Sequence, residues 1–397
     1  MKLAGIFLGS AVAFAAQAVH AVQDCDIAGQ SVNPNNGYTT AGKTGLMRCK
    51  DRDTGQLQRE QELQNGKFMG LVRFYEDGKL AKEHSVNEKG NRNGRAREFT
   101  PDGTVLRDAT YDNGGELGLV RSFYPSGKLR RVSFQAQPGG EQAYAEFNER
   151  GQLSALRCGE KPLLAPAADD ARLCGFGGAS AASPSRIELF DDRGTLSARS
   201  SYLAGQRVRH ESLHASGQPN YQDEISGSTR VQRYFNTSGE KRREAQLQLQ
   251  PNGKSWATER EQDFAPNGTL TRDRRWSAGK AVSEETFYLN GQPRSKVEYG
   301  VAGSGGNSNN GSPALQKTTD YYDSGRVASI EFYSNVNRMR QIPVGTHQRY
   351  SESGKLVSES IYDDRGRIAR EKSWDESGKL LRDDEVFEDG SRKAFAK

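Results

Sequence analysis

The hydrophobic positions of this chain recur in one fixed pattern. An aromatic residue is followed four positions later by a glycine, and then by a small aliphatic residue or a proline, as in Phe123, Gly127 and Leu129. The pattern returns about every 24 residues along nearly the whole sequence, a period typical of modular repeat arrays. Eleven units carry the aromatic residue: Phe74, Phe99, Phe123, Phe147, Phe190, Phe235, Phe264, Phe287, Tyr321, Tyr350 and Trp374. Two more units keep the glycine but have Asp51 or Leu213 in the aromatic position.

Each unit also contains two turn signals, such as Asp77-Gly78 and Lys89-Gly90 in the first clear unit. Pairs of this kind supply the positive φ that hairpin turns require. The segments between them have strand length, several alternate apolar and polar residues, and long helical periodicity is absent. The pattern therefore predicts an all-β fold: an extended antiparallel array of β-hairpin repeats of about 24 residues, forming a single-layer ribbon with long loops.

The eleven aromatic residues form a stripe that has two interpretations. Aromatic residues in register lie on one face of successive hairpins and stabilise a sheet by about 0.2–1 kcal/mol per cross-strand pair. The stripe could instead be a groove for a peptide or a glycan. We favour the structural role and expect burial on one face, because a single-layer array has no other core.

A second set of aromatic residues lies directly beside stripe residues in the sequence, and adjacent strand residues face opposite ways. We therefore expect this second set on the other face. Tyrosine and arginine together are typical of interaction surfaces. The predicted binding surface consists of Arg73, Tyr75, Arg121, Tyr124, Arg233, Tyr234, Tyr288 and Tyr322.

Composition supports a thin sheet. Hydrophobic residues make up 34% of the 397 residues and mean hydropathy is −0.83, which is too little apolar material for a thick core. The 16 Phe, 15 Tyr and 3 Trp are too many for a disordered chain. The net charge of +5 comes from 56 basic and 51 acidic residues that are well mixed, without the basic block of a nucleic-acid binder.

The sequence is organised into seven segments. Lys2 and the apolar stretch 4–16 indicate a secretory signal peptide over residues 1–21, so we expect a periplasmic or secreted protein. The remaining segments are a cap over 22–50, repeats over 51–158, an insertion over 159–184, degenerate repeats over 185–300, a flexible loop over 301–316 and repeats over 317–397. Each interruption is either a domain boundary or a long hairpin loop within one ribbon.

The four cysteines suit an oxidising compartment. Three connectivities are possible, and sequence proximity favours Cys25 with Cys49 and Cys158 with Cys174. Each bond closes a modest loop and contributes about 3 kcal/mol in the chain-entropy description. The spacings suit no tetrahedral zinc site.

One segment, His210-Glu211-Ser212-Leu213-His214, matches the zinc-protease motif H-E-x-x-H. That chemistry requires a helix, whereas Gly217 and Pro219 follow at once and Leu213 occupies the aromatic position of the repeat. In a strand, residues four apart are about 13 Å from each other, too far for one metal ion. We therefore predict an extended segment without metal, no catalytic residues, no cofactor and no enzyme activity.

The stretch from Gly66 to Leu80 resembles the bacterial variant of the MORN repeat, which couples an N-G-x-x-x-G turn to an aromatic residue and then to x-x-x-G-K-L. Residues 94–103, 118–127 and 345–354 repeat this spacing. Proteins with this variant are often labelled YwqK-family antitoxins, so the resemblance implies the fold and an immunity-like role. Residues 362–368 are also similar to the YD repeats of bacterial toxin shells.

Two functions follow as expectations. The favoured one is a secreted, non-enzymatic scaffold that recognises another protein, such as a toxin or an envelope component, and binds no nucleic acid. The alternative is a structural protein of the cell envelope that contacts lipid head groups or peptidoglycan. A membrane surface is the less favoured partner.

Overall fold

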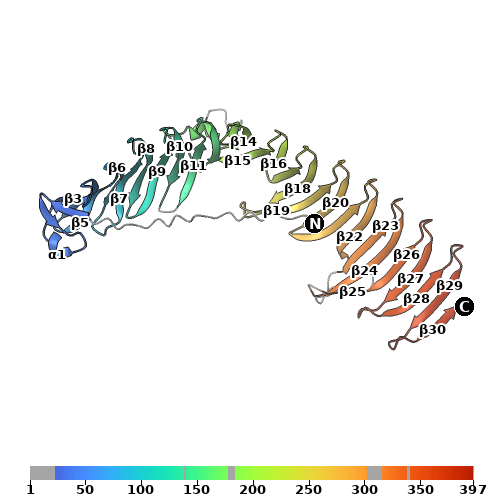
Figure 1. Ribbon diagram of the computed structural model, residues 1–397. Helices are drawn as coiled ribbons and strands as arrows, with labels where there is room; N and C mark the ends of the chain where they lie inside the picture. Colours follow the sequence, from blue (N-terminus) through green and yellow to red (C-terminus); the bar gives the residue numbers. More distant parts are fainter. Residues whose placement is uncertain (1–22, 138–139, 178–183, 302–314, 338–339, 397) are drawn as a thin grey trace, which may run out of the picture. The chain divides into compact units, whose positions relative to one another are not determined.

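The computed structural model describes residues 23–137, 140–177, 184–301, 315–337 and 340–396, where the chain forms thirty strands and two four-residue helices (Figure 1). Every strand pair in these ranges is antiparallel, which confirms the predicted all-β array. The predicted signal peptide and most of the predicted loop over 301–316 lie outside the described residues. The chain divides into two compact units, residues 1–170 and 171–397.

The first unit contains one open sheet of twelve strands. From β3 to β12 the strands follow one another in chain order, and β1 lies between β3 and the edge strand β2. The strands are β1 (Gln23–Ile27), β2 (Gln30–Val32), β3 (Gly45–Asp51), β4 (Leu57–Gln64), β5 (Lys67–Glu76), β6 (Lys79–Val86), β7 (Arg92–Phe99), β8 (Val105–Asp112), β9 (Gly115–Phe123), β10 (Leu129–Gln135), β11 (Glu141–Phe147) and β12 (Leu153–Arg157), with helix α1 (Gly37–Thr40) between β2 and β3.

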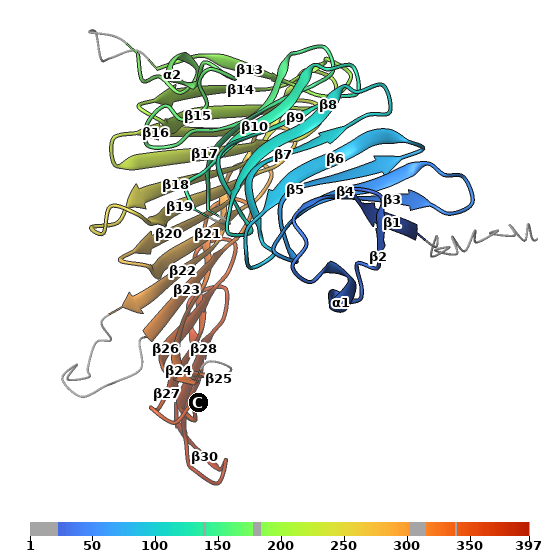
Figure 2. The ribbon, with the colours of Figure 1, turned by 90° about the vertical axis from the view of Figure 1, so that its left-hand side faces the viewer.

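The second unit contains an open sheet of eighteen strands in chain order, preceded by helix α2 (Asp170–Leu173). Figure 2 shows many of these strands lying side by side. They are β13 (Ile187–Phe190), β14 (Leu196–Leu203), β15 (Gln206–Leu213), β16 (Pro219–Ser226), β17 (Thr229–Phe235), β18 (Lys241–Leu249), β19 (Trp256–Phe264), β20 (Leu270–Ser277), β21 (Lys280–Phe287), β22 (Pro293–Val301), β23 (Leu315–Tyr321), β24 (Val327–Asn337), β25 (Arg340–Pro343), β26 (Gly345–Tyr350), β27 (Leu356–Tyr362), β28 (Ile368–Trp374), β29 (Leu380–Val386) and β30 (Arg392–Ala396).

Many of the described hairpins are closed by a repeated five-residue turn. The N–H of its first residue donates to the carbonyl of the fifth, and the N–H of the glycine in the fourth place donates back to the first. Gly127 has φ +79, a conformation that L side chains rarely adopt, so glycine is the residue that suits this place. Fourteen described turns share the pattern and begin at Asn87, Thr100, Tyr124, Asn148, Asp191, His214, Asn236, Ala265, Tyr288, Tyr322, Ser351, Asp363, Asp375 and Phe387.

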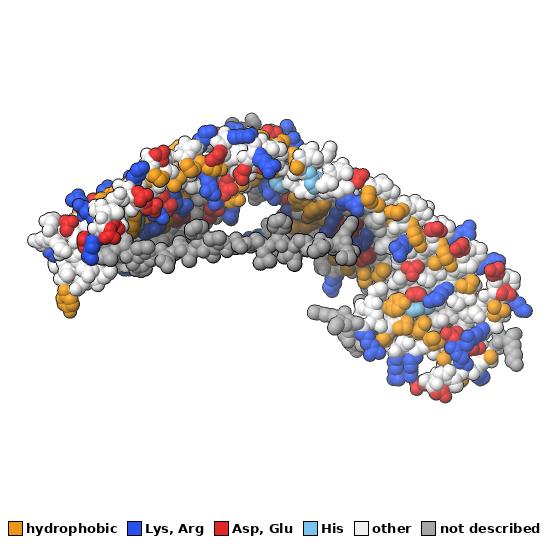
Figure 3. Space-filling model, in the orientation of Figure 1, with side chains coloured by type: hydrophobic (Ala, Val, Ile, Leu, Met, Phe, Trp, Pro, Cys, Tyr) orange, Lys and Arg blue, Asp and Glu red, His pale blue; other side chains and the backbone are white. Residues whose placement is uncertain are grey.

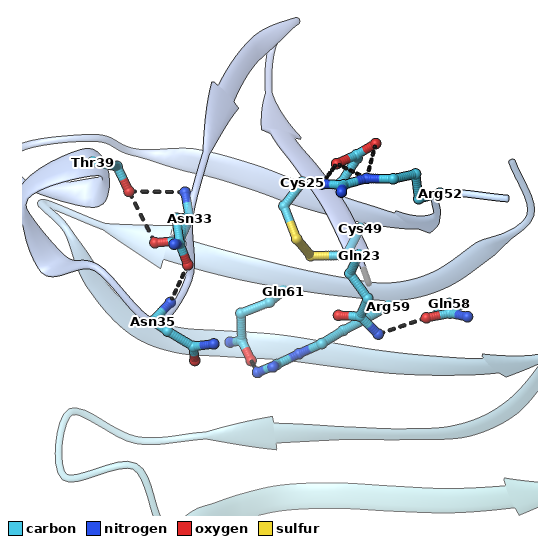
Figure 4. The surroundings of a disulfide bond; sticks show 11 residues. Gln23, Cys25, Asn33, Asn35, Thr39, Cys49, Arg52, Gln58, Arg59 and Gln61 are labelled. Carbon is cyan, nitrogen blue, oxygen red and sulfur yellow. Dashed lines mark hydrogen bonds and ion pairs between the residues drawn. A yellow bond between two sulfur atoms is a disulfide. The ribbon is translucent and has the colours of Figure 1, made fainter. Parts of the chain in front are cut away.

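The N-terminal end of the first sheet is a small capped core. Cys25 and Cys49 lie directly opposite each other in β1 and β3 and form a disulfide bond, as predicted (Figure 4). Around it pack Ile27, Met47 and Leu63, all buried. Helix α1 lies close to β2 (Figure 2), and Thr39 Oγ1 accepts from the Asn33 N–H at 2.9 Å. The remaining two cysteines, Cys158 and Cys174, are disulfide-bonded as well.

A second core covers the last strands of the same sheet. Leu164 and Ala168, from the segment predicted as an insertion, pack against Val132, Ala143 and Ala145 of β10 and β11. All five side chains are buried, at no more than 8% exposure. Part of the insertion therefore adds a local second layer to a sheet that the sequence predicted to be single-layered.

The aromatic stripe is less buried than expected. Ten of the eleven residues are half-buried and Phe74 is 37% exposed. In a single layer the stripe is covered only by cross-strand neighbours, as where Phe123 lies opposite Leu129. The fully buried positions are instead small or aliphatic residues in the middle of strands, such as Val72, Ala109 and Val120.

Phe74 also occupies a different position from the other stripe residues. Phe99 pairs with Val105 across a five-residue turn, whereas Tyr75, not Phe74, holds the equivalent pairing with Leu80. The turn after β5 has only the two residues Asp77 and Gly78 between the paired residues Glu76 and Lys79. It is one residue shorter than the five-residue turn, so the residue four positions before its glycine is Phe74, one place before the residue that holds the stripe position. Among the described residues, no helix is long and apolar enough to cross a membrane.

Candidate binding surfaces

Each sheet has two faces, which we name by the stripe. The stripe face is the one that carries Phe99, Phe123 and Phe147 in the first unit and Phe190, Phe235 and Phe287 in the second. Because side chains alternate along a strand, residues two positions from these also lie on the stripe face. The other face of each sheet is called the opposite face.

A continuous row of charged residues crosses the stripe face of the first sheet. Its members lie directly opposite one another in adjacent strands, and their charges alternate in sign over eight strands. Opposite charges in directly facing positions stabilise a sheet, and like charges there would destabilise it. This charged row consists of Asp26, Arg48, Glu60, Arg73, Glu83, Arg97, Asp108 and Arg121.

The acids of the charged row lie deeper than its arginines. Glu60 accepts from Arg48 Nε at 3.1 Å and from Arg73 Nη1 at 3.3 Å, and Glu83 pairs with Arg73 and Arg97. The Glu60 side chain is 9% exposed and the Arg48 side chain 56%. Burial alone would raise the pKa of Glu60, but hydrogen bonds from Tyr75, Arg48 and Arg73 outweigh it and lower that pKa. The surface therefore presents guanidinium groups above sequestered carboxylates.

The row changes from charged to apolar at Arg121. Its partner across to β10 is Val132, followed by Ala145 and Leu156. These positions lie under the layer that contains Leu164, where a charge would be desolvated. Arg121 has no ion pair in the described part of the chain. The pKa of Asp108 is nevertheless lowered, first by a hydrogen bond from Arg95 and also by the charge of Arg121.

The second sheet repeats this arrangement with less regular signs. Directly opposed positions of β13–β22 on its stripe face are Glu188, Arg199, Glu211, Gln222, Arg233, Glu244, Gln262, Asp273, Glu285 and Lys296. Asp273 is 3% exposed, and its Oδ2 accepts from Arg260 Nη2 at 2.6 Å and from Arg275 Nη2 at 3.3 Å. On the opposite face, Glu261 is held in the same way by Arg243 and Arg274.

The structure divides the predicted binding residues into three groups. Arg73, Arg121 and Arg233 all lie in the rows just described, on the stripe face and not on the opposite one. Tyr75 lies on the stripe face with them, and its Oη donates to Glu60 Oε2 at 2.8 Å. Arginine and half-buried aromatic residues therefore share one face.

Three predicted tyrosines begin five-residue turns and connect them. The Oη of Tyr124 donates to the carbonyl of Phe147 at 2.9 Å, that of Tyr288 to Tyr321 at 2.9 Å, and that of Tyr322 to Tyr350 at 2.7 Å. In each case the acceptor is the stripe residue of the next turn on the same edge. These tyrosines stabilise neighbouring turns instead of decorating a face.

Tyr234 is the member of the predicted set that does reach the opposite face. It is 41% exposed and contacts the ring of Tyr221, at 4.9 Å between centroids, on the neighbouring strand.

The H-E-x-x-H segment is extended, as predicted. His210 lies in β15, its Nδ1 is 2.8 Å from Ser200 Oγ, and burial is the main cause of its lowered pKa. His214 begins a five-residue turn, with Nε2 3.4 Å from the Phe235 carbonyl, the same contact that the turn tyrosines make. The described part of the chain contains no cluster of three or more metal-ligating side chains.

The opposite face of the second sheet contains a hollow of about 340 Å³ over β24 and β26–β29. Its centre is a row of directly opposed residues, Arg349, Ser358, Ser373 and Arg382. Beside it run His347, Ser360 and Glu371 in the same strands. Short serines between long side chains account for the depression. In Figure 3, basic and acidic side chains lie together over the C-terminal strands of this sheet.

The hollow lies where the ladder of the sheet is interrupted. β24 pairs with β26 at Ser329 and Ile330 but with β25 from Tyr333 onward. His347 bridges the change, with its Nε2 2.8 Å from the carbonyl and 3.1 Å from the N of Phe332. The ring of Tyr362 is 4.5 Å from that of His347.

The polar groups around the hollow differ in how fully they are paired. Tyr333 Oη donates to Glu331 Oε2 at 2.5 Å, and burial together with this bond raises the pKa of Tyr333 to about 12. Arg349 forms an ion pair with Glu331 at 3.9 Å, and its side chain is 72% exposed. Burial, and then the charges of Glu371 and Glu331, raise the pKa of Tyr362, so its hydroxyl remains a donor.

Sequence reasoning missed this hollow. Ser358, Ser360 and Ser373 are ordinary strand residues, and nothing in the repeat pattern distinguishes them. A weak signal was available in the sequence, which has no glycine between Gly325 and Gly345, and the strand Val327–Asn337 in this stretch is eleven residues long.

Two stretches of the chain match the MORN repeat variant, residues 116–135 and 343–364. The first runs through β9, the turn that begins at Tyr124, and β10. The second contains β26, its turn and β27, which include His347 and Ser358 of the hollow. The chain therefore carries MORN-variant repeats, and each matched stretch is one β-hairpin.

Among solved structures, one similar chain is that of TcdB2-TccC3-TEV, with 12% identity, a TM-score of 0.19 and coverage of 90% of this chain and 20% of that one. Another is that of the Photorhabdus luminescens Tc holotoxin pore, with 11% identity, a TM-score of 0.19 and coverage of 87% and 23%. This chain spans about a fifth of the length of either. No curated protein matches it.

Proposed function

We propose that this chain is a secreted or periplasmic, non-enzymatic scaffold that binds an acidic surface of another protein, in an antitoxin-like role. The observation that carries the proposal is the arrangement of charge on the stripe face. The acids Glu60 and Glu83 are nearly buried, at 9% and 12% side-chain exposure, while the arginines on either side of them are more exposed, from 34% to 56%. A partner would thus meet guanidinium groups and half-buried aromatic rings, although the total charge of the chain is nearly balanced.

The composition of this face supports protein recognition. Arginine and tyrosine are enriched among the residues that dominate binding energy at protein interfaces. The guanidinium groups are held in place by the carboxylates beneath them, so little conformational entropy is lost on binding. The MORN-variant repeats support a scaffold, and the resemblance to YwqK-family proteins motivates the antitoxin-like role.

The most informative residue for a test is Arg121, which ends the charged row without an ion pair of its own in the described chain. We expect Arg121→Ser to weaken binding of the natural partner by about tenfold, equivalent to 1.4 kcal/mol. Arg130→Ser is the matched control, because Arg130 is an exposed bulge residue of the neighbouring strand and losing it removes the same charge. Equal effects of the two substitutions would count against the stripe face as the interface.

The experiment measures binding to candidate secreted toxins, taken first from any that are encoded beside this gene, and survival of cells that produce both proteins. Binding should weaken but remain measurable when salt is raised from about 0.1 to 1 M, because charge pairs enclosed within an interface are screened less than exposed ones. Binding to anionic lipid vesicles or peptidoglycan that is lost over the same range, without toxin binding, would favour the alternative envelope role.

A further inference from the structure

We propose that the hollow over β24 and β26–β29 binds an acidic sugar. Arg349 donates hydrogen bonds to its carboxylate, and the serines that form the floor of the hollow, Ser358, Ser360 and Ser373, bind its hydroxyl groups. This site is separate from the stripe face and does not depend on the proposed protein-binding function. A volume of about 340 Å³ lies at the lower end of the range of small-molecule pockets, which suits one sugar unit.

The floor of the hollow offers unused hydrogen-bonding groups. Ser358, Ser360 and Ser373 line it, and their hydroxyls make no hydrogen bond to another residue in the described ranges. Each hydroxyl is both a donor and an acceptor. Three such groups on adjacent strands, whose spacing is about 4.8 Å, match a ligand with several hydroxyls better than one with a single polar atom.

The charged groups at the rim differ in how closely they are paired with other residues. The least closely paired is the cation Arg349, so the hollow favours an anionic ligand. Arg382 is committed to Asp384, at 2.5 Å, and Glu371 is paired with Arg392. Within the described residues, the ion pairs of Arg349 are limited to the 3.9 Å contact with Glu331, whose other oxygen already accepts from Tyr333. The Arg349 guanidinium therefore retains donors in the planar arrangement that binds a carboxylate through two parallel hydrogen bonds.

The aromatic wall suits the apolar face of a sugar ring. His347 and Tyr362 form this wall, and the contacts of His347 Nε2 with the backbone N and carbonyl of Phe332 fix the histidine ring. A ring with a negative face attracts the slightly positive C–H groups of a pyranose. The Tyr362 hydroxyl adds a donor at the edge of the same wall.

Binding of D-galacturonate, D-galactose and trigalacturonate to the whole secreted chain, measured by titration calorimetry, tests the proposal. We expect galacturonate to bind about tenfold more tightly than galactose, which has a neutral hydroxymethyl group in place of the carboxylate. A free sugar as the natural ligand predicts equal affinity for the monomer and the trimer. A glycan predicts tighter binding of the trimer.

Two substitutions with matched controls assign the site. Arg349→Gln should remove the preference for galacturonate over galactose, whereas Arg294→Gln, at an exposed arginine of β22, should leave it unchanged. Ser358→Val should weaken binding of both sugars by about tenfold. Ser295→Val places the same side chain on the same face outside the hollow and controls for effects on folding.

Three results would overturn the proposal. They are no heat of binding for galacturonate with the unsubstituted chain, equal affinity for galacturonate and galactose, and an Arg349→Gln variant that behaves like Arg294→Gln.

Discussion

At the scale of single residues, the turn tyrosines have a role that their sequence position conceals. Tyr322 directly follows a stripe residue and would face away from it if the strand continued. The strand ends instead, and Tyr322 Oη donates to the carbonyl of Tyr350 at 2.7 Å. His214 occupies the same place and makes the corresponding contact with Phe235. One turn position thus connects successive hairpins through different side chains.

Removal of this hydroxyl should lower stability measurably. We expect Tyr322→Phe to reduce the free energy of unfolding by about 1 kcal/mol, because the half-buried carbonyl of Tyr350 loses its donor. Tyr234→Phe is the control, since Tyr234 is 41% exposed, and it should change stability by less than about 0.5 kcal/mol. Urea denaturation of both variants measures the difference. Equal losses would mean that the tyrosine contributes through its ring alone.

His84 should give the first unit a pH-dependent stability. Its pKa is lowered, first by burial and then by the charges of Arg92 and Arg59, and its ring stacks on Phe74. A folded-state pKa below the unfolded value of about 6.5 means that the stabilisation is complete above that pH and is lost as pH falls through the folded pKa. We expect His84→Gln to flatten the dependence of unfolding free energy on pH between about 7 and 5. An unchanged slope would contradict this assignment.

At the scale of one element, the five-residue turn depends on its glycine. Gly103 has φ +90, and a Cβ there would meet no atom within 4 Å, so the cost of a side chain is conformational and not steric. Gly103→Ala should therefore destabilise the hairpin by about 1–2 kcal/mol. Gly37→Ala in α1 is the control, because a Cβ at Gly37 would also meet no atom within 4 Å but the backbone there has no positive φ. This substitution should not lower the stability. Thermal melts of the two variants decide the point.

At the scale of the whole molecule, the two compact units should respond separately to local damage. The Cys25–Cys49 bond closes a 24-residue separation at the end of the first sheet. Replacing both cysteines with serine should cost that unit about 3 kcal/mol. Each hairpin contacts mainly its neighbours, so hydrogen exchange should rise first in β1–β4.

The control for this double variant lies within the same molecule. Amides of β26–β29 in the second unit should keep the exchange rates of the unsubstituted chain. A uniform rise across both units would show that the chain unfolds as one cooperative body.

The sequence by itself determined the period, the turns and the hairpins, because these depend on local chemistry. A glycine four places after Phe123 specifies a turn wherever the chain lies in space. The same local reasoning was sufficient to predict that the H-E-x-x-H segment is extended and that Cys25 pairs with Cys49.

Only the tertiary structure decided which residues face one another across strands. A register that shifts by one residue moves a side chain to the other face, and turn length and bulges control the register. The exchange of Phe74 and Tyr75 follows from a turn that is shorter by one residue. The charged row from Asp26 to Arg121 is invisible in a linear reading, because its members come from eight strands. The serine floor of the hollow exists for the same reason, since Ser358 and Ser373 become neighbours only when β27 and β28 pair.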